Sequence, residues 1–152
     1  MKENQEGLPD RCRVRITLRG STGSGPVDRT MEGELFPKGG SLYLRYQEPP
    51  ESEMGRTVTT VKAAPSELRI IRHGDTPFDQ VFAAGVTHYG YLDTPQGRME
   101  LETFTEHLEV RGGHRAPEPA GLLLTVSWAY RLSVMGEPAG EFRLILTAER
   151  MP

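Results

Sequence analysis

The stretch from Leu122 to Val134 alternates between two kinds of side chain, and this alternation constrains the fold more than any other feature of the sequence. One phase is apolar throughout and consists of Leu122, Leu124, Val126, Trp128, Tyr130, Leu132 and Val134. The other phase is mixed and consists of Leu123, Thr125, Ser127, Ala129, Arg131 and Ser133. Because successive residues of a β-strand point to opposite faces of its sheet, a period of two predicts a long strand with one buried face. We therefore expect Trp128 and Tyr130 in the interior, with Ser127, Ala129 and Arg131 facing outward.

Many shorter runs of the same character follow one another along the chain. Glycine and proline, 17 and 12 residues, separate runs that are rich in branched and aromatic side chains. Behind the turn residues Gly136, Pro138 and Gly140, a second alternating run from Phe142 to Ala148 predicts a C-terminal hairpin. The other runs are RCRVRITLR, SLYLRYQE, GRTVTTVK, ELRIIRH, PFDQVFA, VTHYGYLD and RMELETFTEHLEV. Together the runs predict about ten short strands, a number that is typical of a barrel or a sandwich.

Local signals also predict how the strands are connected. The segment Thr94–Gly97 has proline and glycine where a type I turn favours them, which predicts a hairpin. In RMELETFTEHLEV the apolar phase shifts by one residue before Phe104, so we expect a bulge or bend near Thr103. Longer loops are expected at Ser21–Pro26, Pro49–Gly55 and Gly112–Pro119.

The N-terminal run RCRVRITLR separates arginines from apolar residues. Its apolar phase consists of Cys12, Val14, Ile16 and Leu18, and its polar phase of Arg11, Arg13, Arg15, Thr17 and Arg19. An antiparallel sheet with one face in water commonly has such strands, and this is the interpretation that we favour. A patch that binds an anion or a partner is the alternative.

Length and charge limit the classes of protein to which the chain can belong. A chain of 152 residues fits one domain, which we expect at residues 11–152 behind a flexible N-terminal segment, residues 1–10. The net charge of −3 and the pI near 5.8 argue against nucleic acid as a partner. The single cysteine requires no oxidising compartment, and no signal sequence or membrane-spanning apolar run is found. We therefore expect a soluble, cytoplasmic protein with no membrane partner.

Five stretches of the sequence carry a family resemblance: SLYLRYQE, TVTTVK, ELRIIRHG, DTPQGRMELETFTEHLEV and WAYRLSVMGEPAGEFRLILTA. Their most specific parts are Tyr46 with Glu48, the threonine-rich TTVK, Arg72 with Gly74, and TPQG followed by Glu102, Thr103 and Thr105. In these stretches the chain resembles the YwiB-like family of uncharacterised bacterial β-barrel proteins, whose fold is calycin-like. The resemblance implies a closed antiparallel barrel of about eight to ten strands, a lipocalin- or streptavidin-like meander. It implies no activity, and ligand binding, as in other calycin barrels, is an expectation by analogy.

The tripeptide Arg72-His73-Gly74 follows an apolar run, as it does in phosphohistidine-forming phosphatases. That chemistry needs a further arginine, a second histidine and an acid to converge on the phosphoryl group. Here strands surround the tripeptide, and His88, His107 and His114 offer no local pair for a phosphate or a metal ion. We therefore expect a protein that is not an enzyme and that has no cofactor and no metal. A phosphatase that uses the tripeptide is the least favoured alternative.

Two non-enzymatic functions stay open. The first is the binding of a small hydrophobic or anionic ligand inside the barrel. The aromatic residues that we expect to point inward, and that line such a site or fill a closed core, are Tyr46, Phe78, Phe82, Trp128, Tyr130 and Phe142. The second is an interaction barrel, a homodimer or a docking module with a filled core. It is suggested by Leu123, Met135 and Ile145, apolar residues on otherwise polar phases.

Arg72 is the member of the tripeptide that we connect with binding. It shares a phase with Leu68, and if this phase is the inner one, Arg72 points into the barrel. An inward arginine must be paired, so it needs Glu48, Glu102 or an anionic ligand, and Gln80 can add an amide to the same lining. An arginine at the rim with its head in water is the alternative. The candidate ligand-binding residues are therefore Tyr46, Glu48, Arg72, Gln80, Glu102, Trp128 and Tyr130.

Overall fold

The computed structural model describes residues 11–50, 55–75, 77–112 and 121–152, and its regular elements are antiparallel β-strands. The strands are β1 (Cys12–Thr22), β2 (Gly25–Lys38), β3 (Ser41–Gln47), β4 (Thr57–Ala64), β5 (Glu67–Gly74), β6 (Phe78–Phe82), β7 (Thr87–Thr94), β8 (Gly97–Gly112), β9 (Leu122–Val134) and β10 (Glu137–Arg150). The expected all-β fold is thus confirmed. The flexible segment expected at residues 1–10, most of the loop expected at Pro49–Gly55 and nearly all of the one expected at Gly112–Pro119 lie outside the described residues.

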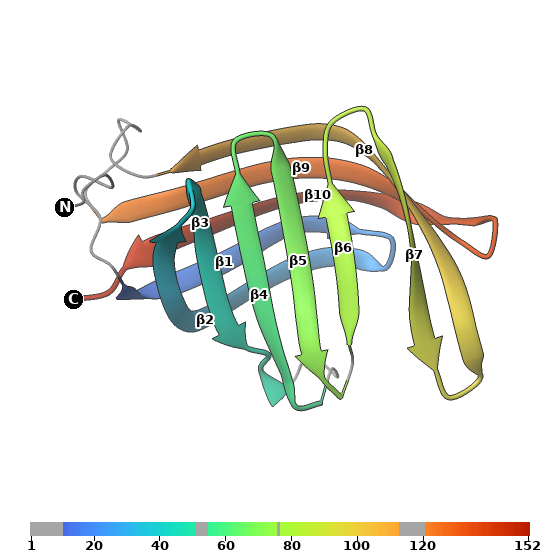
Figure 1. Cartoon of the computed structure of the whole chain (residues 1–152), viewed down its shortest axis with the longest axis horizontal. Helices are drawn as coiled ribbons and strands as arrows, with labels where there is room; N and C mark the ends of the chain where they lie inside the picture. Colours follow the sequence, from blue (N-terminus) through green and yellow to red (C-terminus); the bar gives the residue numbers. More distant parts are fainter. Residues whose placement is uncertain (1–10, 51–54, 76, 113–120) are drawn as a thin grey trace.

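The strands form one sheet that nearly closes on itself (Figure 1). Each strand pairs with the next from β1 to β6 and from β7 to β10, and β1 also pairs with β10. The first and last strands therefore meet, and the two free edges belong to β6 and β7, which are consecutive in the chain. Within the described residues no ladder joins these edges. Near the connection between them, the backbone N–H of Gly85 donates to the Thr105 carbonyl oxygen at 2.7 Å, and the N–H of Thr105 donates to the Val86 carbonyl oxygen at 3.2 Å. The expected meander barrel is confirmed, with a seam between β6 and β7.

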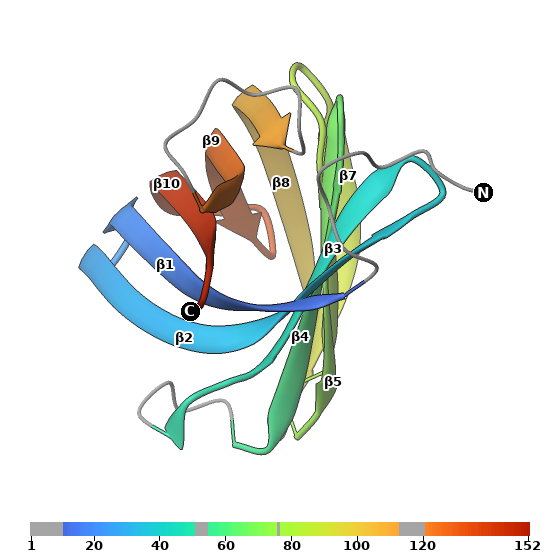
Figure 2. The same cartoon turned by 90° about the vertical axis from the view of Figure 1, so that its left-hand side faces the viewer.

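Two walls enclose the interior of the barrel (Figures 1 and 2). Strands β3 to β6 run side by side in one wall and cross the direction of β1, β9 and β10 in the other. Strand β2 connects the walls, because it pairs with β1 through Gly25–Leu35 and with β3 through Glu34–Lys38. A Cβ atom at Gly33 would come within 2.5 Å of the Arg45 carbonyl oxygen and 2.9 Å of the Tyr46 Cβ. The close approach of β2 and β3 therefore requires glycine at this position.

Tight turns join the strands of both predicted hairpins. Strands β9 and β10 are connected by Met135 and Gly136, whose φ angles of 53° and 83° are both positive, as in a type I′ turn. The predicted hairpin at Thr94–Gly97 connects β7 and β8, and its two end residues pair with each other. Both hairpin predictions are confirmed.

The first hairpin differs from the longer loop expected at Ser21–Pro26. Thr22 pairs with Gly25, so a two-residue turn joins β1 to β2. Strand β2 then extends over 14 residues for which the sequence analysis assigned no strand. Its alternation is interrupted by Gly33 and Pro37, residues that weaken a strand pattern although β2 accommodates both.

The expected bulge in β8 is confirmed at a slightly different position. The register of β8 with β9 shifts between Thr105 and His107, just beyond the expected Thr103. Phe104 therefore still belongs to the outer phase, where the guanidinium carbon of Arg131 lies 5.0 Å from its ring centroid. The assignment of Phe104 to the apolar inner phase was wrong, because the bulge follows it rather than precedes it.

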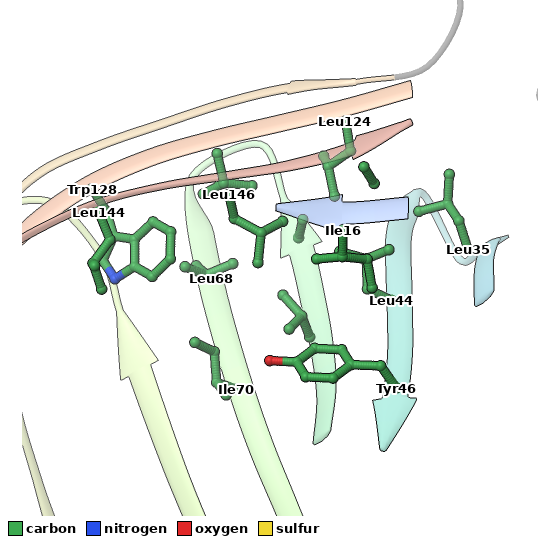
Figure 3. Packing of buried hydrophobic residues seen from close by; sticks show 14 of the residues in the cluster. Ile16, Leu35, Leu44, Tyr46, Leu68, Ile70, Leu124, Trp128, Leu144 and Leu146 are labelled. Carbon is green, nitrogen blue, oxygen red and sulfur yellow. The ribbon is translucent and has the colours of Figure 1, made fainter. Parts of the chain in front are cut away.

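Buried apolar side chains from both walls meet in the middle of the barrel (Figure 3). The cluster includes Val14, Ile16, Leu35, Leu44, Leu68, Leu124, Val126, Trp128 and Leu146. Trp128 and Tyr130 are buried, which confirms the predicted inner phase of β9. Ala129 lies on the outer phase but is also buried, because the ladders place it between the larger residues Arg143 and His107.

The arginine face of β1 is the solvated side of the sheet, as the favoured interpretation has it. Arg13 and Arg19 of this strand, and Arg11 just before it, form ion pairs with acidic residues of β2. These pairs are Arg11–Glu34 at 2.7 Å, Arg13–Glu32 at 3.2 Å and Arg19–Asp28 at 3.3 Å. The acidic partners neutralise much of the positive charge that an anion-binding patch would need.

Candidate binding site inside the barrel

A row of four inward-facing residues crosses the wall formed by β3 to β6. Tyr46 pairs with Thr59, Thr59 with Arg72, and Arg72 with Phe78, so the four side chains lie on one face of adjacent strands. Tyr46 and Thr59 are buried, and Arg72 and Phe78 are half-buried. The predicted inner phase of β5 is therefore confirmed, and it directs Arg72 into the barrel.

Glu48 extends this polar row beyond the end of β3. Its backbone N–H donates to the Thr57 carbonyl oxygen at 2.8 Å, so the pairing with β4 continues and Glu48 follows Tyr46 on the inner face. Its Oε2 accepts a hydrogen bond from Thr59 Oγ1 at 2.5 Å and lies 3.8 Å from Arg72 Nε. The side chains of Glu48 and Arg72 are 3% and 18% exposed. Burial therefore brings the two charges together at the inner surface.

Of the two carboxylates expected to pair with Arg72, the structure selects Glu48. Glu102 lies between the buried residues Leu101 and Thr103 of β8, so the alternation of the strand points it outward, and it is exposed. The prediction that Glu102 lines the site is wrong for this reason.

Buried polar atoms without a partner mark the interior. The Nε atom of Arg72, Oγ1 of Thr105 and Nε1 of Trp128 are buried and make no hydrogen bond within the described residues. The distance from Arg72 Nε to Glu48 is too long for a hydrogen bond, so this contact is electrostatic only. Buried polar atoms are nearly always hydrogen-bonded in folded proteins, which makes these donors candidates for contact with a ligand.

Two buried tyrosines stay protonated over a wide range of pH. Burial, and next the Glu48 carboxylate, raise the pKa of Tyr46 to about 12, although Arg72 and a hydrogen bond with Thr59 act in the opposite direction. Burial raises the pKa of Tyr130 to about 12, and Arg72 opposes this shift too. Both phenols are therefore neutral hydrogen-bonding groups near the Arg72 guanidinium.

Aromatic rings lie beside the polar row. Tyr130 stacks on Phe142 with 4.7 Å between ring centroids, and Phe82 lies 4.6 Å from Tyr130 and 5.9 Å from Trp128. Phe142 is half-buried, whereas the other three rings are buried. These rings offer an apolar surface to whatever contacts the interior.

Gln80 is buried on the inner face of β6, as expected, and it forms a hydrogen bond to another strand. Its Nε2 donates to Thr103 Oγ1 at 3.1 Å. Because Gln80 belongs to β6 and Thr103 to β8, this hydrogen bond reaches across the seam and holds the barrel together where no ladder does.

The side chains of Arg72 and His73 lie on opposite faces of the sheet. His73 is exposed at the end of β5, on the opposite face from Arg72, so the two side chains do not point to one ligand. Within the described residues no group of three or more histidine, cysteine, aspartate and glutamate side chains is placed to hold a metal ion. His114 lies outside the described residues.

No helix in the described part of the chain has the length and apolarity to cross a membrane.

The family resemblance includes Thr59 and Thr105, but the sequence analysis placed neither residue in the candidate site. Thr59 holds the Glu48 carboxylate, and Thr105 has its hydroxyl buried without a partner. The alternation of Thr57, Thr59 and Val61 was the available signal, because these three residues share one phase and are all buried. A threonine has no strong preference for either face, so that signal becomes informative only once the apolar neighbour assigns the phase.

Comparison with known proteins finds relatives without an assigned activity. The family model described as a domain of unknown function (DUF1934) matches residues 13–146. The chain is 23% identical to the uncharacterised β-barrel protein YwiB of Bacillus subtilis (strain 168) over 105 residues, 69% of this chain and 72% of YwiB. The crystal structure of YwiB from Bacillus subtilis has a TM-score of 0.77, at 19% identity over 95% of both chains. At this identity the structural likeness shows a shared fold.

Proposed function

The chain belongs to the DUF1934 family of β-barrel proteins of unknown function, and from this premise we propose that it is a non-enzymatic barrel that binds a small molecule. The inner face of β3 to β6 supplies the polar part of the site, through Glu48, Thr59 and Arg72. The rings of Tyr130 and Phe142 supply an apolar part. The ligand combines a hydrogen-bond acceptor with an apolar body.

The observation that carries this proposal is the buried, unpartnered Nε of Arg72. An arginine that serves stability alone commonly forms two parallel hydrogen bonds with its carboxylate. Here Glu48 stays 3.8 Å from Nε and accepts its hydrogen bond from Thr59 instead. The guanidinium is thus held in the interior by charge while its Nε makes no hydrogen bond, and an acceptor atom of a ligand would satisfy this donor.

A protein-interaction role is the second candidate. Met135 and Ile145 are exposed, as expected for a docking patch, but Leu123 is buried and takes no part in one. The observation that favours this role is new: Tyr89 and Tyr91 on the outer face of β7 are 63% and 58% exposed. Tyrosine is enriched in protein interfaces. Light scattering coupled to size-exclusion chromatography tests the homodimer directly, since a monomer at micromolar concentration contradicts it.

We also propose that His73 is not a phosphatase nucleophile, because Arg72 and His73 face opposite sides of β5. Hydrolysis of a generic phosphomonoester by the wild-type protein is expected to equal that by His73→Ala. A higher rate for the wild-type protein would contradict this.

Native mass spectrometry of the protein purified from its own host tests the binding function. We expect a mass adduct on the wild-type protein that is lost in Arg72→Met, because the substitution removes the donors and keeps an apolar side chain of similar length. Arg69→Met is the matched control, since Arg69 lies on the same strand but is engaged outside with Asp79 at 2.6 Å. No adduct on the wild-type protein, or an adduct that persists in Arg72→Met, would contradict the proposal.

A further inference from the structure

Arg29 of β2 lies on an inward phase of the barrel. It pairs with Leu18, and it stands between Val27 and Met31 on one face of the strand. Leu18, Val27 and Met31 all belong to the core cluster or pack against it. Since paired residues share a face, the side chain of Arg29 leaves the strand on its inner side, and it is half-buried there.

Arg29 differs from three of the four other arginines of the first hairpin in its partners, and the fourth, Arg15, is exposed on the outer face. Arg11, Arg13 and Arg19 point outward and are each paired with an acidic residue. Arg29 has no ion pair or hydrogen bond among the described residues. The Arg29 residue is half-buried on the inner face, whereas Arg11, Arg13 and Arg19 are exposed on the outer face.

The segment of β2 that holds Arg29 lies on the side of the barrel where β2 and β3 separate. Pairing of these strands ends at Glu34 and Arg45, and a Cβ atom added at Gly33 would clash with Tyr46 at the start of the polar row. From there β3 continues toward Glu48, while the inward positions of β2 continue to Met31 and Arg29. Figure 2 shows β2 on one side of this end of the barrel, with β4 and β5 on the other.

The inward-facing charges do not balance. Among the described lysine, arginine, aspartate and glutamate residues, those that face inward and are at least partly buried are Arg29, Glu48 and Arg72. Two guanidinium groups therefore stand against one carboxylate. One further negative charge in the interior would bring the net charge of the inward-facing groups to zero. A low-polarity environment favours zero net charge.

We infer that Arg29 is a second ligand-binding residue beside Arg72, and that the ligand is an apolar molecule with a single negative charge, such as an organic acid. The inference rests on the proposed binding function and specifies its ligand class. Arg29 and Arg72 bind the oxyanion, Glu48 holds Arg72 in place, and the aromatic rings bind the apolar body. A neutral ligand of the same shape leaves the two arginines unbalanced and binds less tightly.

A matched pair of fluorescent probes tests the inference. Anilinonaphthalene sulfonate is an apolar monoanion, and phenylnaphthylamine has the same ring system without the sulfonate. Energy transfer from the only tryptophan, Trp128, reports binding in the interior, because this side chain is buried in the core cluster. We expect the wild-type protein to bind the sulfonate at least about tenfold more tightly than the neutral probe, as one charge-assisted hydrogen bond alone allows.

Substitutions then test the role of each arginine separately from the class of ligand. Arg29→Met and Arg72→Met are each expected to weaken sulfonate binding about tenfold relative to binding of the neutral probe. Arg29→Lys keeps the charge and should retain part of the preference, whereas Arg19→Met, on the outer face of the same hairpin, should change neither affinity. Circular dichroism melts confirm that each variant is folded.

The outcomes are distinguishable. If Arg72→Met weakens sulfonate binding and Arg29→Met does not, the role of Arg29 is wrong and the proposed function stands. If the wild-type protein prefers the neutral probe, or shows energy transfer with neither, the ligand class is wrong. The adduct experiment described above then decides the proposed function by itself.

Discussion

Glu48 and Arg72 form a pair that a purely structural core would not need. Burying two opposite charges costs several kcal/mol, and the 3.8 Å separation forgoes the hydrogen bonds that offset this cost. Well-packed apolar residues at such positions are often as stable as the pair. A charged pair that stability does not require points to a binding role. The contribution of the pair to the free energy of unfolding can be measured.

We expect Glu48→Leu to destabilise the protein by about 3 kcal/mol, because Arg72 then lacks a counter-charge. Arg72→Leu should also destabilise it, since Glu48 is left buried, whereas the double variant should recover most of the loss. Urea unfolding followed by circular dichroism measures all three. The exposed pair Arg98–Asp93, 64% and 66% exposed, is the control, and its leucine variants should change stability little. Additive losses in the Glu48 and Arg72 cycle would contradict this account.

At the scale of elements, the turn between β9 and β10 contains a residue in an unfavourable conformation. Met135 has a φ of 53°, in the left-handed region that costs most residues about 1 kcal/mol. Asparagine followed by glycine is the preferred sequence of a type I′ turn, so Met135→Asn should stabilise the hairpin by about 0.5–1 kcal/mol. The loss of the Met135 Sδ contact with the Glu100 N–H at 3.1 Å acts against this gain.

The melting temperature of Met135→Asn measures the net effect. Met135→Val is the control, because a branched side chain tolerates positive φ least and should lower the melting temperature. An asparagine variant less stable than the wild-type protein would show that the sulfur contact outweighs the backbone conformation.

For the molecule as a whole, we expect a loss of stability at alkaline pH, because two buried tyrosines have raised pKa values. The pKa values of Tyr46 and Tyr130 are raised from 10.0 to about 12 in the folded state. The folded state therefore binds more protons than the unfolded state between these values. The stability that the two tyrosines contribute is constant below pH 10 and is lost as pH rises toward 12. The loss is at most roughly 3 kcal/mol for each tyrosine.

Urea unfolding at a series of alkaline pH values measures this decline. Tyr130→Phe should make the decline shallower, because one of the two phenols is gone. Tyr89→Phe, at an exposed position, should leave the slope unchanged. Equal slopes in the wild-type protein and Tyr130→Phe would contradict the assignment of the decline to the buried phenols.

The sequence by itself determined the faces of the strands whose alternation is regular. The inner phase of β9, with Trp128 and Tyr130, and the inward direction of Arg72 in β5 follow from alternation with apolar neighbours. Alternation is a property of the backbone over a few residues, so it needs no knowledge of distant segments. Strand β2 was not predicted, because Gly33 and Pro37 interrupt this local pattern.

Only the tertiary structure decided which side chains meet. Glu48, and not Glu102, pairs with Arg72 because the registers of β3, β4 and β5 set Tyr46, Thr59 and Arg72 in one row. Gln80 bonds across the seam to β8, and Arg29 lies on the inner side through its pairing with β1. Register and the crossing of the two walls depend on contacts between residues far apart in the chain, and a slip of one position would turn each of these side chains to the other face.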